Sequence, residues 1–231
     1  MTFFKYDIIF MVKQMIKAVI FDMDGLMFDT ESIWLKACSI TAKEMGYDVS
    51  LDVALSCIGT NYETTKKIFE LQYDFDFEDF YIKYRKRMNN LIDNEGIEVK
   101  EGLFELLSYL KKSGYKLAIA SSSKKNTIYK YLKITGIDKD LFSHIVSGED
   151  FEVSKPNPDI FLKTCFLLNM EPKEVMVLED SNNGIKAASE AGCLSVLIPD
   201  KDIIKEEVLE KADYKVNSLN EVINILEKVA N

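Results

Sequence analysis

The sequence has few of the residues that several common catalytic and structural sites need. It contains a single histidine, His144, which gives a Ser-His-Asp triad little support. We interpret His144 as a structural residue near the start of a strand, because a short apolar run begins there. The cysteines are widely spaced and form no Cys-X-X-Cys pair, so we expect free thiols in a reducing cytosol and neither disulfides nor a zinc site. They are Cys38, Cys57, Cys165 and Cys193.

Long apolar runs and an excess of positive charge are missing as well. The apolar stretch Ile8 to Val12 is too short to cross a membrane and is weak as a signal peptide. The net charge of −9 argues against a nucleic-acid surface, which would present a basic stripe. We therefore expect a cytoplasmic, monomeric protein that binds neither nucleic acid nor membrane.

The most informative stretch that is present is an apolar run that ends abruptly in two acids. Ala18 to Phe21 predicts a buried parallel strand, and Asp22, Asp24 and Gly25 follow it. Ligands of open α/β sheets bind just beyond the carboxyl ends of the strands, which is where these carboxylates are predicted to lie. Such a pair suits a hard cation, and it also suits a nucleophile beside an acid–base group. A capped turn or a calcium loop would explain the pair in isolation.

Three further polar clusters follow in the second half of the chain. Lys116–Ala120 is a candidate strand that ends in Ser121–Ser123, and Ser154–Pro158 opens a helical stretch that contains Lys155. A third candidate strand, Glu174–Leu178, ends in the acid pair Glu179 and Asp180. Each cluster alone has an ordinary structural explanation, such as a helix cap, a solvated lysine or a loop acid pair. Their joint occurrence in this order favours a phosphate site.

These four clusters resemble the motifs of the haloacid dehalogenase superfamily over about residues 16 to 229. The similarity is greatest to the group of β-phosphoglucomutase and small sugar-phosphate phosphatases. It implies that Asp22 is a nucleophile that forms an aspartyl-phosphate and that Asp24 is the acid–base group. It further implies that Ser121 donates a hydrogen bond to the phosphate and that Lys155 reduces charge repulsion there. The backbone amides of Met23, Asp24 and Ser122 would complete the phosphate cradle.

The same resemblance implies Mg²⁺ as the cofactor. Its expected ligands are the carboxylates of Asp22 and Asp180 and the backbone carbonyl of Asp24, all hard oxygens. Glu179 would bind through water or orient a direct ligand. A haloalkanoate dehalogenase is disfavoured, because that branch lacks the second aspartate and needs no metal.

Alternating strand and helix patterns predict an α/β fold with a doubly wound parallel sheet and a small helical cap. We expect residues 1–14 to be an N-terminal extension, with Met11 or Met15 as a candidate initiator. The α/β core is expected to comprise residues 15–30 and 99–231, and the helical cap residues 31–98. Strands are expected near 17–21, 116–121, 144–147, 174–178, 194–198 and 213–216. Helices are expected near 32–45, 62–71, 76–92, 101–113, 124–135, 157–169, 182–191, 202–211 and 218–229.

Substrate choice is expected to depend on the cap. The β-phosphoglucomutases have a histidine and a cap-loop arginine at positions that correspond here to Trp34 and approximately Tyr62, which favours a phosphatase over a mutase. Asn61 is a candidate for bonding a sugar hydroxyl, although a helix-capping role is equally compatible. The basic run 83–87 is favoured as a solvated helix face, and Arg87 is our choice if one of its cations faces the substrate. Trp34 is assigned to the cap core rather than to a platform for a nucleobase.

The predicted function is thus a Mg²⁺-dependent hydrolase of a small phosphate monoester such as a sugar phosphate. A phosphosugar mutase and a nucleotide phosphatase stay as alternatives, the latter because residues 25–31 and 142–148 are similar to pseudouridine-5′-phosphatases. A catalytically inactive sugar-phosphate sensor is a further alternative, but it would normally show a damaged motif, and none is damaged here.

Overall fold

The computed structural model describes residues 16–230, so the predicted extension over residues 1–14 lies outside the described residues. One six-stranded sheet, in the order β3-β2-β1-β4-β5-β6, forms the core, and every pairing in it is parallel. All six predicted strands are present, and the doubly wound α/β fold is confirmed. The strands are β1 (Ala18–Phe21), β2 (Lys116–Ser121), β3 (His144–Ser147), β4 (Val175–Glu179), β5 (Leu194–Leu197) and β6 (Tyr214–Lys215).

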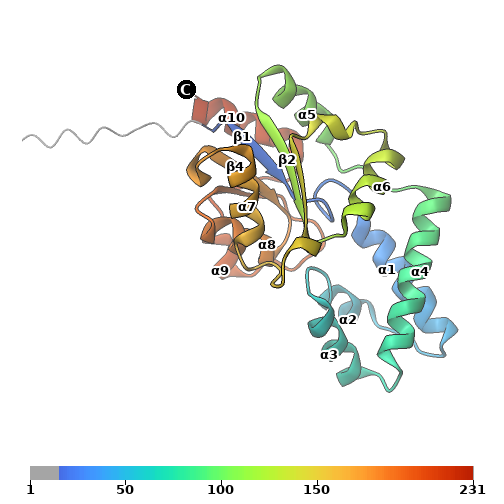
Figure 1. Cartoon of the computed structure of the whole chain (residues 1–231). Coiled ribbons are helices and arrows are strands. Elements are labelled where there is room, and N and C mark those ends of the chain that lie inside the picture. The colour runs from blue at the N-terminus through green and yellow to red at the C-terminus, as the bar shows by residue number, and fades with distance from the viewer. Residues whose placement is uncertain (1–15, 231) are drawn as a thin grey trace, which may run out of the picture.

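Both faces of the sheet are covered by helices, which explains why its strands are almost continuously apolar. Successive residues of a strand point to opposite faces. In β1, Val19 and Phe21 join the apolar cluster beneath α5, α6 and α10, whereas Ala18 and Ile20 join the cluster beneath α7 and α8. Figure 1 shows these two layers on either side of the strands. The helices are α5 (Leu103–Lys112), α6 (Lys125–Thr135), α7 (Asp159–Leu168), α8 (Asn182–Glu190) and α10 (Val222–Ala230).

Between β1 and α5 the chain forms a separate lobe of four helices beside the sheet (Figure 1). Its core is aromatic, with Phe69 against Phe77 and Phe80 at centroid distances of 5.7 and 5.0 Å. The helices are α1 (Thr30–Glu44), α2 (Leu51–Ser56), α3 (Tyr62–Gln72) and α4 (Phe77–Glu95). This lobe corresponds to the expected cap, and its assignment as a domain with boundaries at residues 31 and 98 stays a prediction.

Two short segments connect the cap to the core, and they lie side by side. Phe28 forms an antiparallel bridge with Val99. The amide of Asp29 donates to the carbonyl of Glu98 at 3.0 Å, and the amide of Lys100 donates to the carbonyl of Met27 at 2.9 Å. The two crossings are therefore held together at the base of the cap, next to the carboxyl end of β1.

Two parts of the helix prediction differ from the structure. The six-residue helix α2, capped by Ser50, was not predicted, because it is too short to show a clear apolar period. The helix expected over 202–211 is reduced to α9 (Glu206–Leu209). The reason is that Asp202 instead accepts hydrogen bonds from the amide and side chain of Asn182, at 3.1 and 2.8 Å, which fixes this loop to α8.

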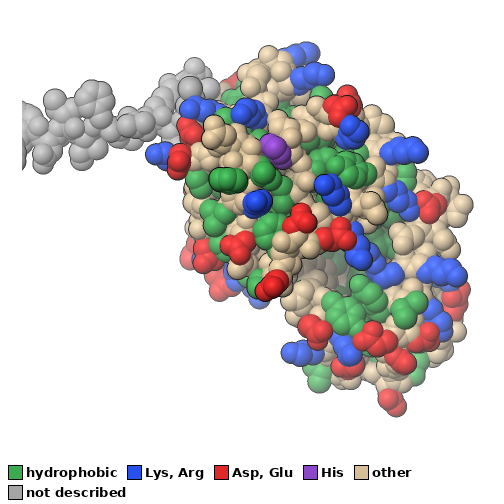
Figure 2. All heavy atoms as spheres, viewed as in Figure 1, with side chains coloured by type: hydrophobic (Ala, Val, Ile, Leu, Met, Phe, Trp, Pro, Cys, Tyr) green, Lys and Arg blue, Asp and Glu red, His purple; other side chains and the backbone are tan. Residues whose placement is uncertain are grey.

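Charged side chains of both signs are distributed over the surface of the protein. On the face shown in Figure 2, acidic and basic side chains are interspersed over both the core and the cap. Within residues 16–230, the helices include none with the length and apolar character needed to span a bilayer.

Candidate active site

The predicted site residues meet at the carboxyl edge of three neighbouring strands. Asp22 follows β1, Ser121 ends β2, and Glu179 and Asp180 lie at the end of β4. Since β1 lies between β2 and β4 in the sheet, the ends of these strands are adjacent. Lys155 reaches the same point from the loop before α7. The sequence prediction that these five residues converge agrees with their positions in the structure.

Lys155 is the cation at the centre of this cluster. Its ammonium donates to Asp22 Oδ1 at 2.5 Å, to Glu179 Oε1 at 2.7 Å and to the carbonyl of Ala120 at 3.0 Å. It also lies 4.8 Å from the ring centroid of Phe161. Burial alone would lower the pKa of Lys155, but the carboxylates of Asp22 and Glu179 raise it above its ordinary value. The lysine is therefore charged and held in one position. The predicted helix start at residue 157 is slightly early, since α7 begins at Asp159.

Three carboxylates gather next to this lysine. One oxygen each of Asp22, Glu179 and Asp180 lies within 4.8 Å of the other two. Burial raises the pKa of Asp22 to about 7, with a further contribution from Glu179. Burial and the charges of Glu179 and Asp22 raise the pKa of Asp180 well above its usual range. A divalent cation would relieve this repulsion, and hard carboxylate oxygens suit Mg²⁺, so the donor set fits the predicted metal.

The two acids after β4 have different surroundings. The second oxygen of Glu179, Oε2, accepts from the amide of Asp180 and from Ser181 Oγ, both at 3.1 Å. Protein donors thus engage both oxygens of Glu179, which suits an orienting role better than a direct metal contact. Asp180 lies directly over Gly25, where an added Cβ would approach Asp180 Oδ2 to 2.1 Å. Gly25 has a φ of +83° as well, so the turn after the first motif requires glycine on two counts.

Asp24 lies apart from the three clustered carboxylates. Its Oδ2 accepts a hydrogen bond from Ser123 Oγ at 2.7 Å and lies 3.5 Å from Ser121 Oγ. Burial raises the pKa of Asp24, and this is partly offset by hydrogen bonds from Ser123 and Thr30 and by the charge of Arg85. Ser123, Thr30 and Arg85 were not among the predicted site residues. The serine run pointed to this region, but its pattern does not indicate which hydroxyl contacts which group.

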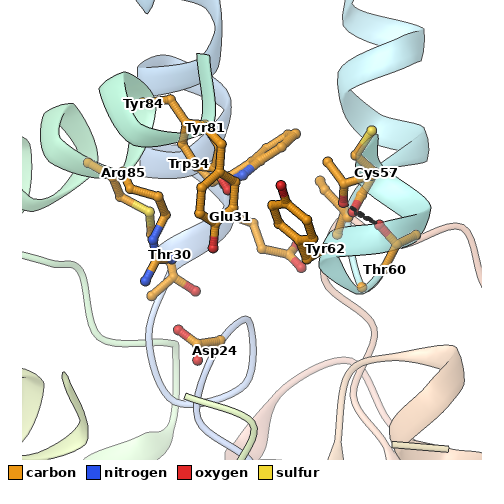
Figure 3. Close-up of a pocket in the computed structure, with 14 residues that line it drawn as sticks. Asp24, Thr30, Glu31, Trp34, Cys57, Thr60, Tyr62, Tyr81, Tyr84 and Arg85 are labelled. Atoms are coloured by element: carbon orange, nitrogen blue, oxygen red, sulfur yellow. Dashed lines mark hydrogen bonds between the residues drawn. The ribbon is translucent and has the colours of Figure 1, made fainter. Parts of the chain in front are cut away.

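Two cavities meet at Asp24. The one that we call the core cavity, about 410 Å³, is lined by Asp22, Lys155 and Asp180 and also by the predicted residues Ser122 and Asn61. The one that we call the cap cavity, about 270 Å³, lies beneath α3 and α4 (Figure 3). Both are lined by Asp24, Glu31, Gly59 and Thr60, so they adjoin along these four residues.

The roof of the cap cavity consists of aromatic side chains. Trp34 from α1 lies edge-on to Tyr84 of α4, with centroids 6.2 Å apart. Tyr62 of α3 lies edge-on to Tyr81 at 4.8 Å. Figure 3 shows these rings above Asp24. Trp34 packs in the cap core, as predicted, and lines the cavity at the same time.

Arg87, the predicted candidate for a substrate-facing cation, lines neither of these two cavities. Its Nε donates to Thr41 Oγ1 at 3.3 Å and its terminal nitrogen pairs with Glu44, on the side of α4 that faces α1. Arg85, two residues earlier, lines the cap cavity instead. Residues two apart on a helix point in widely different directions, so only one of the two can face the cavity.

Local structure restricts which atoms of Asn61 and Met23, two predicted substrate-binding residues, are available to a substrate. The side chain of Asn61 caps α3, since its Oδ1 accepts from the amide of Thr64 at 2.9 Å. Asn61 thus has the capping role that the sequence allowed, while it also lines the core cavity. The side chain of Met23 is fully buried in the hydrophobic core, so only its backbone is available to a substrate.

A parallel sheet with a helical cap, and a lysine among carboxylates at the strand ends, define a hydrolase of the haloacid dehalogenase type. The sequence profile described as "Haloacid dehalogenase-like hydrolase" matches residues 19–198. The chain therefore belongs to this family, and within it to the phosphoric monoester hydrolases.

Named relatives extend this comparison. The chain is 30% identical over 179 residues to the phosphorylated carbohydrates phosphatase of Thermotoga maritima, covering 76% of this chain and 82% of that one. It is 27% identical over 211 residues to hexitol phosphatase B of Escherichia coli K12, covering 90% and 94%. Against SUPPRESSOR OF QUENCHING 1 of Arabidopsis thaliana it is 30% identical but spans only 19% of that longer protein. Among solved structures, β-phosphoglucomutase of Clostridium difficile has a TM-score of 0.73 at 30% identity, covering 93% and 97%.

Proposed function

We propose that this protein is a Mg²⁺-dependent phosphatase that hydrolyses a small phosphate monoester, such as a sugar or sugar-alcohol phosphate, through an aspartyl-phosphate on Asp22. The main support is the junction of the two cavities. Asp22 and Lys155 line only the core cavity, whereas Asp24 lines both. A phosphate next to Asp22 would have its leaving oxygen at Asp24 and the rest of the molecule in the cap cavity.

In the first step a carboxylate oxygen of Asp22 attacks phosphorus, and the bond from phosphorus to the leaving oxygen breaks. Lys155, 2.5 Å from Asp22 Oδ1, reduces the repulsion between this carboxylate and the phosphate dianion. Asp24 donates its proton to the leaving oxygen. Burial raises the pKa of Asp24, which favours the protonated form that this step needs.

In the second step water attacks phosphorus and the aspartyl bond breaks, which releases phosphate and regenerates Asp22. Asp24, now ionised, accepts the proton of this water. Asp22, Asp180 and Glu179 would hold the magnesium ion, with Glu179 as the orienting group. When bound, the ion supplies positive charge that screens the phosphate oxygens and the nucleophile. We place this activity in the cytoplasm, with a small phosphorylated metabolite as the partner.

The first test is phosphate release from a panel of sugar, sugar-alcohol and nucleoside monophosphates, with and without Mg²⁺. We expect metal-dependent release by the wild type and none by Asp22→Asn, because an amide is not a nucleophile here. The variant should stay folded, as judged by circular dichroism. Retained turnover in a clean preparation of Asp22→Asn would contradict the mechanism.

Asp24→Asn is expected to lower kcat by roughly 10²–10⁴-fold, the usual contribution of a positioned acid–base group. The loss should be smaller for p-nitrophenyl phosphate, whose leaving group needs no proton. A comparison of kcat for this substrate and for a sugar phosphate measures the difference. An equal loss for both substrates would exclude Asp24 as the proton donor.

A phosphosugar mutase is the second candidate, and one observation favours it. The cap-loop arginine of the mutases is missing, but Arg85 brings a cation to the same cavity from α4. Incubation with β-glucose 1-phosphate separates the two activities. Formation of glucose 6-phosphate without phosphate release would establish the mutase, and free phosphate the phosphatase.

A further inference from the structure

The sequence contains only two arginines, and both lie on α4. They flank the buried stripe of this helix on opposite sides, with Arg85 following Tyr84 and Arg87 preceding Met88. Arg87 is paired with Glu44. Among the described residues, no carboxylate lies within ion-pairing distance of Arg85. Figure 3 shows the Arg85 side chain extending from α4 towards Thr30 and Asp24.

Arg85 is also the one basic side chain among the described residues that line the cap cavity. The other charged residues there are Asp24 and Glu31, and four of the uncharged lining residues are aromatic. An unpaired guanidinium directed into a small cavity is suited to a planar or tetrahedral anion, which it can bind through two parallel hydrogen bonds.

An ion pair with Asp24 explains the position of the Arg85 side chain less well than binding of a substrate anion does. A guanidinium paired with Asp24 would favour the ionised carboxylate and would oppose the protonation that the leaving group requires. In the structure the two groups do not form an ion pair. The space between Arg85 and Asp24 belongs to the cavity, and it is where the departing half of a substrate would lie.

We propose that Arg85 is a specificity-determining residue that binds an anionic group, either a carboxylate or a second phosphate, on the leaving part of the substrate. This inference rests on the proposed phosphatase function. The transferred phosphate would occupy the core cavity, the leaving oxygen would face Asp24, and the second anion would contact Arg85. The aromatic rings would cover the carbon skeleton between the two charged ends.

Three substrates test this inference. Phosphoglycolate has a carboxylate on its leaving part, glucose 1,6-bisphosphate has a second phosphate, and sorbitol 6-phosphate has neither. They are assayed with the wild type, Arg85→Met, Arg85→Lys and the matched control Arg87→Met. Arg87 points away from the cavity, so its variant should keep the wild-type substrate preference.

For Arg85→Met we expect kcat/KM to fall by roughly 10- to 100-fold on whichever anionic substrate the wild type prefers, mainly through KM. The loss on sorbitol 6-phosphate should be at least tenfold smaller, and Arg85→Lys should restore part of it. A wild-type preference for phosphoglycolate identifies the carboxylate, and a preference for the bisphosphate identifies the second phosphate. An equal loss on all three substrates, or a wild-type preference for sorbitol 6-phosphate, would overturn the proposal.

A binding measurement separates this inference from the proposed function. Calorimetry with Asp22→Asn, with and without Arg85→Met, gives the affinity for the preferred anionic substrate without turnover. Tighter binding by the protein that retains Arg85 supports the inference, whether or not the wild type releases phosphate. A wild type that releases no phosphate would refute only the phosphatase function. Equal affinities of the two proteins would refute the role of Arg85.

Discussion

Glu31, at the base of α1, lies where the two cavities meet, and its environment disfavours a negative charge. Burial and the neighbouring Asp200 carboxylate raise the pKa of Glu31 to about 8. Asp200 is itself bound to Lys100 at 2.5 Å through Oδ1, while its Oδ2 is buried without a hydrogen-bond partner. The folded protein therefore favours a protonated Glu31 more than the unfolded chain does.

This shift predicts the sign of a pH effect on stability. A carboxyl group whose pKa is higher in the folded state stabilises the fold while it is protonated, and the contribution is lost as pH rises through the folded pKa. For Glu31 the affected range extends from 4.5, its ordinary value, to about 8. Glu31→Gln should therefore unfold at a higher temperature than the wild type above this range and show a smaller difference at about pH 5.

Thermal unfolding measured across this pH range tests the expectation. Glu63→Gln serves as the control, since Glu63 is an exposed acid of α3. The interpretation fails if Glu31→Gln and Glu63→Gln have the same pH profile.

The site residues that sequence reasoning identified are those fixed by strand ends. Asp22, Ser121 and Glu179 had predictable positions because a buried parallel strand has one carboxyl end, and neighbouring strands share an edge. Arg85 could not be predicted in this way. Arg85 and Arg87 flank the buried stripe of α4 on opposite sides. The period of the apolar residues predicts this buried stripe, but it does not indicate which of the two sides faces the active site.

At the scale of an element, α8 illustrates how a helix start positions a catalytic-site acid. Ser181 caps the helix by accepting from the amide of Gly184 at 3.1 Å, and its hydroxyl donates to Glu179. The Glu179 carboxylate lies against Gly184 so closely that an added Cβ would be 1.8 Å from its Cδ. The absence of a side chain at Gly184 thus makes room for Glu179.

Gly184→Ala is expected to destabilise the protein, although a change from glycine to alanine within a helix normally has the opposite effect. Such a change within a helix normally stabilises it by about 1 kcal/mol. Here we expect a lower unfolding temperature and reduced kcat, because the new methyl group displaces Glu179 from Lys155. Gly46→Ala is the control, since no atom lies within 4 Å of its added Cβ, and it should keep its activity despite a φ of +86°. Wild-type kcat with higher stability in Gly184→Ala would show that Glu179 has another position available.

The helices and strands were predictable to different degrees for a physical reason. The strands of the sheet are buried on both faces, so short apolar runs bounded by polar clusters mark them well. Helix α2 has six residues and α9 has four, too few to establish a period. Tertiary contacts decide such short elements, as the bonds between Asp202 and Asn182 do in the loop before α9.

For the whole molecule, the packed carboxylates at the strand ends predict a link between metal binding and stability. Mg²⁺ binding to the folded state alone stabilises it by about 2.7 kcal/mol at a hundredfold excess over Kd. Without metal, Asp180→Asn should unfold at a higher temperature than the wild type, since burial and the charges of Glu179 and Asp22 raise the pKa of Asp180. With Mg²⁺ the order should reverse, because the variant loses a ligand.

Thermal unfolding of both proteins over a Mg²⁺ titration measures this crossover. Asp48→Asn, a change of an exposed acid in the cap between α1 and α2, controls for net charge. An equal Mg²⁺ shift in the wild type and in Asp180→Asn would place the metal elsewhere.

Because the two cavities share only four lining residues, the substrate preference of such a protein can evolve separately from its chemistry. The groups assigned to bond breaking belong to the strand ends, whereas the roof of the cap cavity is built from α1, α3 and α4. After a gene duplication, one copy could acquire a different metabolite through substitutions in these three helices, while the chemistry at Asp22 stayed under purifying selection. Substitutions that change the substrate and substitutions that change the reaction would then lie in different segments of the gene.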